Sequence, residues 1–255
     1  GPSKVVKASP KRHKIKDGGV TFYVLGDSHL RDQHGFPGSY AFSRAAGTID
    51  RRLSAINRMV GEGKDQPEPE RGYTLTEAYL AKVLELVQMN SGKAVVYFLS
   101  VGTNDLRDAK KATEDDREDK IDELMTRFGK LMTKVEETPG AALFVLEPIP
   151  CNRGIQKDRD QLDQLLESEV QRHEKVRYVT LTHGPKPFLP RGASGLHYSR
   201  TLWHDDLHLN KIGARLIVRA LSSTMNQLGT EVFFVDPAAL EPRGLTGRPA
   251  TARKP

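Results

Sequence analysis

The chain has a single cysteine, Cys151, among 255 residues, and this scarcity excludes two classes of protein. One thiol cannot build a disulfide framework, and it cannot supply a cysteine-rich zinc site. We expect Cys151 to be a buried structural thiol. A chain of this length can bury a sizeable hydrophobic core without such cross-links.

Long apolar segments are also missing. No run approaches the roughly 20 apolar residues that a transmembrane helix needs, and residues 1–19 lack the apolar stretch of a signal peptide. Together with the lone cysteine, this favours an intracellular location. The opening Gly1-Pro2-Ser3 resembles the remnant of a cleaved tag, so we expect the natural start to lie elsewhere.

Positive charge is concentrated at the two ends of the chain. The net charge is +6, yet residues 20–235 sum to −1, because residues 1–19 and 236–255 together carry +7. We expect both ends to be disordered basic tails and residues 20–235 to form one domain. Basic tails can attract nucleic acid or an anionic membrane by counterion release, and the alternative is that they are solvated linkers.

Apolar runs typical of buried strands alternate with amphipathic segments typical of helices. We expect strands at 20–25, 39–42, 94–100, 142–146 and 176–181, with a short extra one at 231–235. Helices are expected around 53–60, from a capping box at Thr74–Glu77 to residue 91, and at 121–135, 162–170 and 210–227, with a charged loop at 107–119. The alternation predicts a parallel sheet with helices on both faces.

Polar or small residues follow several of these strands. Ser28 comes directly after the first strand, Gly47 after the second, Asn104 after the third and Cys151 after the fourth. Because the carboxyl ends of parallel strands meet at one edge of a sheet, we expect a functional site there.

A serine hydroxyl becomes a useful nucleophile only when a base takes its proton. His208 is the best candidate base, and Asp205, three residues earlier, can reach its Nδ1 across one turn. Asp206 could replace Asp205, but the spacing favours Asp205. The alternative for His208 is a surface or helix-capping role.

Acyl transfer also needs hydrogen-bond donors where negative charge develops. The side-chain amide of Asn104, the backbone N–H of Gly47 and the N–H of Ser28 itself could form this oxyanion hole. As an alternative, Gly102-Thr103-Asn104-Asp105 is a polar turn and Gly47 a flexible one.

In order and spacing, these pieces resemble the blocks of the SGNH (GDSL-type) hydrolases over roughly residues 20–228. The matching residues are Gly26-Asp27-Ser28, Gly47, Gly102-Thr103-Asn104-Asp105 and Asp205-Asp206-Leu207-His208. The surroundings of Gly47, Ala45-Ala46-Gly47-Thr48, depart from the Asn-Gly-Gly-like second block that is common in the family.

The resemblance implies a three-layer α/β/α sandwich, flavodoxin-like, with a five-stranded parallel sheet of order 2-1-3-4-5. It implies cofactor-free hydrolysis of a small-molecule, lipid or sugar ester through Ser28, His208 and Asp205, with Ser28, Gly47 and Asn104 as the oxyanion hole. Within the family, Leu99–Leu106, Phe36-Pro37-Gly38 and the basic flanks look most like the esterase-type domains of animal retroelement open reading frames.

Three other functions compete with this interpretation. His204-Asp-Asp-Leu-His208 is similar to the zincin pattern, in which two histidines four residues apart on a helix bind zinc. An SGNH-like domain could instead act as a nucleic-acid-binding or interaction module that uses the basic tails. An α/β-hydrolase would need a Gly-x-Ser-x-Gly elbow, which Gly26-Asp-Ser-His-Leu30 does not match.

Further residues near these motifs have weaker signals. His29 and His34 flank the candidate nucleophile and could line a pocket, but we expect loop histidines to be incidental. Tyr198 and Trp203 precede the candidate acid and could either wall an acyl site or pack in the core.

Overall fold

A computed structural model describes the part of the chain that carries the sheet and most of its helices. The described residues are 20–27, 29, 49–50, 56–60, 74–110, 112–152, 154–190 and 201–228. The expected strands at 39–42 and 231–235 and both expected tails lie outside them.

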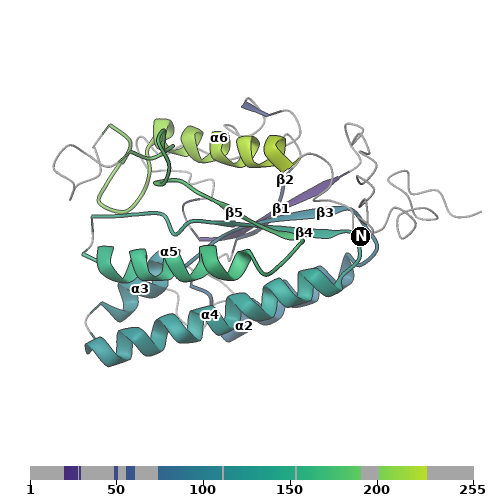
Figure 1. The fold of residues 1–255 in the computed structure, drawn as a ribbon, viewed down its shortest axis with the longest axis horizontal. Coiled ribbons are helices and arrows are strands. Elements are labelled where there is room, and N and C mark those ends of the chain that lie inside the picture. Colours follow the sequence, from purple (N-terminus) through teal and green to yellow (C-terminus); the bar gives the residue numbers. More distant parts are fainter. Residues whose placement is uncertain are drawn as a thin grey trace, which may run out of the picture.

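The centre of the fold is a parallel sheet (Figure 1). It has five strands in the order β2-β1-β3-β4-β5. Every residue of β3 and β4 is buried, as expected for central parallel strands made of continuous apolar runs. The strands are β1 Thr21–Gly26, β2 Ile56–Val60, β3 Val95–Ser100, β4 Ala141–Leu146 and β5 Val176–Val179.

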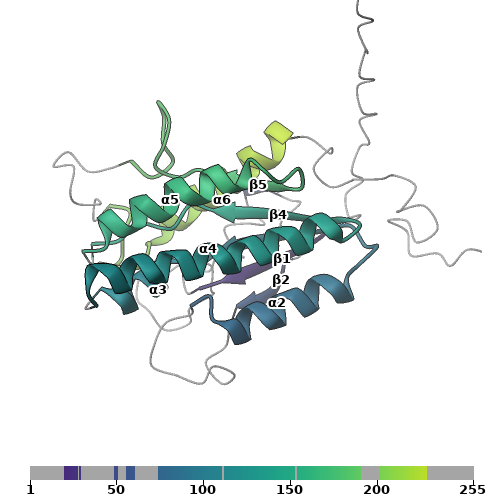
Figure 2. The ribbon, with the colours of Figure 1, turned by 60° about the horizontal axis from the view of Figure 1, so that its bottom comes forward.

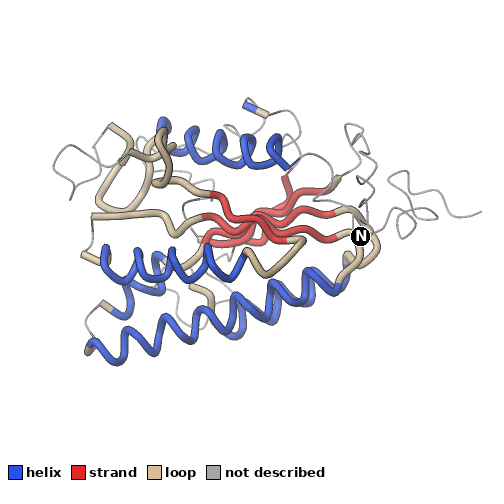
Figure 3. The backbone as a smooth tube through the Cα atoms, in the orientation of Figure 1, coloured by secondary structure: helices blue, strands red, loops and turns tan. Residues whose placement is uncertain are grey.

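Helices cover both faces of this sheet. The C-terminal helix α6 lies on one face, and α2, α4 and α5 lie on the other (Figures 1 and 3). Figure 2 shows the long α4 running in front of the sheet, on the same face as α2. The described helices are α2 Glu77–Met89, α3 Thr103–Ala109, α4 Glu114–Glu137, α5 Gln156–Val170 and α6 Lys211–Leu228. The predicted parallel sheet between helices is confirmed.

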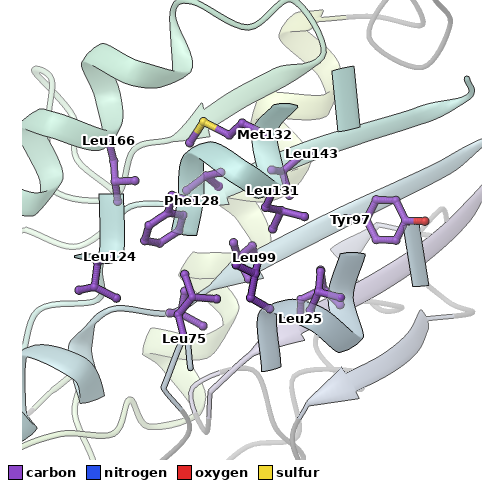
Figure 4. Close-up of a cluster of buried hydrophobic side chains, with 14 of the residues drawn as sticks. Leu25, Leu75, Tyr97, Leu99, Leu124, Phe128, Leu131, Met132, Leu143 and Leu166 are labelled. Atoms are coloured by element: carbon purple, nitrogen blue, oxygen red, sulfur yellow. The ribbon is translucent and has the colours of Figure 1, made fainter. Parts of the chain in front are cut away.

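Two hydrophobic cores arise because successive side chains of a strand point to opposite faces of the sheet. Phe98 and its alternate neighbours pack toward Ile217 and Leu221 of α6. Tyr97 and Leu99 instead face the helices of the other layer, where Phe128 of α4 fills the centre of the cluster (Figure 4). The two cores hold the sheet rigid, so that the loops at its carboxyl edge start from fixed positions.

The helix predicted around residues 53–60 is wrong, because residues 56–60 form β2 and pair in parallel with β1. The apolar residues Ile56, Met59 and Val60 have a spacing that fits one face of a helix, but the free strand edge of β1 offers a backbone ladder. A long-range partner of this kind overrides a local pattern.

Two other local predictions also need correction. The N-cap of α2 is Thr76, whose side chain accepts the N–H of Tyr79, so the capping box proposed at Thr74–Glu77 is not formed. The charged loop expected at 107–119 contains the end of α3 and the start of α4. A capping box of Thr113 and Asp116 opens α4, and acidic residues in the first turn favour a helix there.

Cys151 is buried, as predicted, and follows β4. Among the described helices, none combines the length and the apolar character that crossing a membrane would require.

Candidate active site

The strands β1 and β3 end side by side, and the backbones of their last residues approach closely. Gly26 pairs with Ser100, and a Cβ atom on Gly26 would lie 2.0 Å from the Ser100 carbonyl oxygen. The φ angle of Gly26 is 136°, which L side chains rarely adopt. Asp27 then donates its N–H to the same Ser100 oxygen at 3.0 Å. The segment after β1 is therefore anchored directly to the end of β3.

Two of the predicted site residues, Ser28 and Gly47, lie outside the described residues. The neighbours of Ser28 in the chain, Asp27 and His29, are described and buried.

Asn104 lies in the first turn of α3, which begins directly beyond β3. The turn requires Gly102, whose φ angle is 115°. Asn104 is 1% exposed, and its Oδ1 accepts a hydrogen bond from Arg107 Nη1 at 3.0 Å. Because a guanidinium only donates, it selects the amide oxygen and directs the NH₂ group of Asn104 away from Arg107.

Asp205 and His208 lie in a compact loop before α6. An antiparallel bridge joins Trp203 to Leu209, and the N–H of His204 donates to the His208 carbonyl at 2.8 Å. The segment is therefore folded back on itself and is not helical, so the zincin-like helix with His204 and His208 on one face is not formed. The buried Trp203 packs within the core on the α6 face.

The predicted contact between Asp205 and His208 is present. Asp205 Oδ2 lies 2.9 Å from His208 Nδ1, while Asp205 Oδ1 accepts the backbone N–H groups of Leu207 at 2.7 Å and His208 at 2.6 Å. Asp206 is exposed, and its carbonyl accepts the N–H of Asn152. The carboxylate beside the histidine is thus that of Asp205, as the spacing predicted.

These hydrogen bonds fix the charge of Asp205. Partial burial alone would raise its pKa, but the ring and backbone donors of His208 and the N–H of Leu207 lower the pKa to about 2. Asp205 is therefore ionised at neutral pH. A carboxylate held against Nδ1 sets the tautomer and orientation of an imidazole whose Nε2 is to act as a base.

His29 connects the end of β1 to this loop and is not incidental, contrary to our prediction. Its side chain is fully buried. Its Nδ1 lies 2.9 Å from Asp27 Oδ1, and its Nε2 lies 2.9 Å from the Leu207 carbonyl oxygen. The rings of His29 and His208 are 5.8 Å apart, centroid to centroid. The residue after Ser28 therefore contacts the residue before His208.

The charge environment of His29 differs from that of an ordinary buried histidine. Burial alone would lower the pKa of His29, but the charge and hydrogen bond of Asp27, the Leu207 carbonyl and the charge of Asp205 raise it above its ordinary value. A buried histidine paired in this way favours the protonated form.

A further cluster at the carboxyl ends of β4 and β5 contains the only described group of side chains with a spacing suited to a metal ion. One oxygen or nitrogen each from Glu147, Asp163 and His183 lies within 4.8 Å of the others. The buried guanidinium of Arg159 bonds to Glu147 and lies 3.9 Å from Asp163. This guanidinium is a protein cation held among the carboxylates, so the cluster is explained as an internal ion-pair network.

Sequence reasoning assigned no contact at the site to Asp27, His29 or Arg107. Asp27 and His29 have a local signal, since an Asp-x-His sequence directly after a buried strand can form a side-chain pair. Arg107 lies three residues after Asn104, which is one helical turn, but that signal appears only once α3 is known to be a helix.

No family sequence model and no curated protein sequence matches the chain. Solved structures do match. A member of the lipolytic G-D-S-L family from Veillonella parvula is 11% identical, with a TM-score of 0.57 over 82% of this chain and 100% of that one. The acetylxylan esterase Axe2 from Geobacillus stearothermophilus is 14% identical, with a TM-score of 0.55 over 87% of this chain and 100% of that one. The chain shares its α/β fold with these two proteins.

Proposed function

We propose that the chain is a serine ester hydrolase of the SGNH type, in which Ser28 is the nucleophile, His208 the base and Asp205 the residue that orients it. The observation that carries the proposal is the hydrogen-bonded Asp205–His208 pair, in a loop tied through His29 to the segment of Ser28. The shared fold with G-D-S-L and acetylxylan esterases supports it.

In the first step, His208 Nε2 takes the proton of the Ser28 hydroxyl while the serine oxygen attacks the ester carbonyl. Negative charge develops on the carbonyl oxygen, where the N–H of Ser28, the N–H of Gly47 and the NH₂ group of Asn104 would stabilise it. Collapse of this intermediate breaks the ester C–O bond, and the leaving alcohol receives the proton from His208.

In the second step, water attacks the acyl group on Ser28 and gives its proton to His208. The carboxylic acid leaves, and the serine oxygen recovers its proton. Throughout the cycle Asp205 stays ionised and stabilises the imidazolium of His208. No cofactor takes part in either step. Because Axe2 is an acetylxylan esterase, we take small acyl groups on sugars as the first substrate class to test.

The test compares hydrolysis of p-nitrophenyl esters of short and long acyl chains by wild type and Ser28→Ala. We expect wild-type turnover that chelator leaves unchanged and a loss of roughly 10⁴-fold or more in kcat for Ser28→Ala. Ser91→Ala is the matched control, because Ser91 lies in the turn between α2 and β3, at the opposite edge of the sheet. A folded wild type that cleaves no ester, or a Ser28→Ala variant with full activity, would overturn the proposal.

A further inference from the structure

The peptide group that joins Leu207 to His208 is held at both ends. Its carbonyl faces His29 Nε2 at 2.9 Å, and its N–H donates to Asp205 Oδ1 at 2.6 Å. This peptide is the backbone attachment of the His208 ring. Any rotation of it would move His208 and would break two hydrogen bonds at once.

The hydrogen-bond inventory of His29 determines its protonation. A carbonyl oxygen only accepts, so Nε2 must carry a proton to bond to Leu207. Nδ1 faces Asp27 Oδ1, which also accepts the backbone N–H of His29 at 3.0 Å. An aspartate carboxylate only accepts hydrogen bonds, so Nδ1 must carry a proton as well.

We infer that Asp27 and His29 are positioning residues: Asp27 keeps His29 as an imidazolium, and His29 fixes the Leu207–His208 peptide so that His208 is aimed for catalysis. The inference rests on the proposed function for its kinetic consequence. The two histidines then have opposite tasks, since His208 must exchange a proton in each cycle and His29 must keep both of its protons.

Other titratable groups near the pair are compatible with this division. From the loop before α6, Asp205 favours the charged form of His29, and the ring of His208 lies alongside. From α2, the hydroxyl of Tyr79 lies near Gly26 and Asp27, and burial raises the pKa of Tyr79 so that this hydroxyl stays neutral. The pair therefore has an acidic and neutral environment, which suits an imidazolium.

The kinetic test uses His29→Leu, with His173→Leu as control. His173 also pairs with a carboxylate, Glu169, but it follows α5 at the opposite edge of the sheet. We expect His29→Leu to lower kcat by up to roughly 10²-fold with little change in KM, because misaligned catalytic groups slow the chemical step without weakening substrate binding. The control should match wild type. A folded His29→Leu enzyme with wild-type kcat would overturn the inference.

A spectroscopic test does not depend on activity and covers the case in which His29→Leu fails to fold. In wild type at about pH 8, above the ordinary histidine pKa of about 6.5, ¹⁵N NMR should find both ring nitrogens of His29 protonated. The isosteric Asp27→Asn variant should lose the Nδ1 proton in the ordinary pH range. If wild-type His29 instead has only one protonated nitrogen at that pH, the inference is wrong even where ester hydrolysis is confirmed. If no ester is cleaved, the same spectra still decide the protonation of His29.

Discussion

His208 and His29 each pair with an aspartate at the same edge of the sheet, and the two pairs differ in burial and in geometry. The His208 side chain is 20% exposed and its partner Asp205 is 36% exposed, whereas His29 and Asp27 are 0% and 1% exposed. Asp205 contacts Nδ1 and the backbone N–H of His208, while His29 has acceptors at both ring nitrogens. Under the proposals above, the same chemical pair serves proton transfer in one place and alignment in another.

In a third pair, His183 with Asp163, the histidine is neither buried like His29 nor held through Nδ1 like His208. His183 is 45% exposed, and it contacts Asp163 through Nε2 at 2.5 Å. Nε2 is the nitrogen that His208 would use toward Ser28. Asp163 is also engaged by Tyr178 and lies near Arg159. This pair fastens a loop to α5, so a histidine beside an aspartate does not by itself mark a base.

The largest effect is expected at His208, where a substitution should lower kcat but leave stability almost unchanged. Replacing the base, as in His208→Gln, should lower kcat by roughly 10⁴- to 10⁶-fold. The melting temperature should change little, because the side chain is partly exposed and its pair with Asp205 lies at the surface. Ester kinetics and thermal unfolding of the same sample measure both. A variant that loses activity only because it unfolds would contradict this assignment.

The second prediction compares the two aspartates by stability. Asp27→Ala leaves the backbone N–H and the ring Nδ1 of the buried His29 without their acceptor and should destabilise the fold by about 1–3 kcal/mol for each group left unsatisfied. Asp205→Ala should cost about 1 kcal/mol or less, because solvent screens a pair this exposed. Urea unfolding at neutral pH measures both values. Equal losses of stability in the two variants would contradict the distinction between the buried His29–Asp27 pair and the more exposed His208–Asp205 pair.

Acid and alkaline unfolding should sharpen this second comparison, because the two shifts have opposite signs. The pKa of Asp205 is lowered to about 2, so its contribution is complete above its ordinary value of about 4 and disappears as pH falls toward 2. The pKa of His29 is raised, so its contribution is complete below about pH 6.5 and disappears as pH rises through the higher folded value. The stability of Asp205→Ala should therefore approach that of wild type at low pH. The stability of His29→Leu should approach that of wild type at high pH.

The sequence predicts the parts of the fold and site that depend on local pattern. Continuous apolar runs identify β1, β3 and β4, because central parallel strands are buried on both faces. The contact of Asp205 with His208 is predictable because three residues separate them and one turn brings them together. By contrast, β2 forms against β1 across a long stretch of chain, and His29 reaches a carbonyl 178 residues away. No local pattern reports contacts of that range.

The third prediction concerns the amide of Asn104, which the proposed mechanism, unlike its use of the base, needs only to stabilise developing charge. Asn104→Ala should lower kcat by roughly 10²- to 10³-fold, the usual cost of one oxyanion donor. Arg107→Met should cost less, roughly 10-fold, because the amide stays in place but loses the donor that sets its orientation. Steady-state kinetics should place the whole loss in kcat for both variants. If Arg107→Met proves as damaging as Asn104→Ala, Arg107 contacts substrate directly.

The smallest effect is expected at His183. This prediction tests whether burial and geometry, and not pairing with an aspartate alone, determine the role of a histidine. Burial alone would lower the pKa of His183, but its bond to Asp163 and the charge of Glu147 raise it. Its contribution to stability is therefore complete below about pH 6.5 and disappears as pH rises further, and solvent screening limits it to about 0.5 kcal/mol. His183→Gln should leave kcat unchanged and lower the melting temperature slightly at about pH 6, with a difference from wild type that shrinks as pH rises. A large loss of kcat would mean that the cluster at the ends of β4 and β5 belongs to the active site.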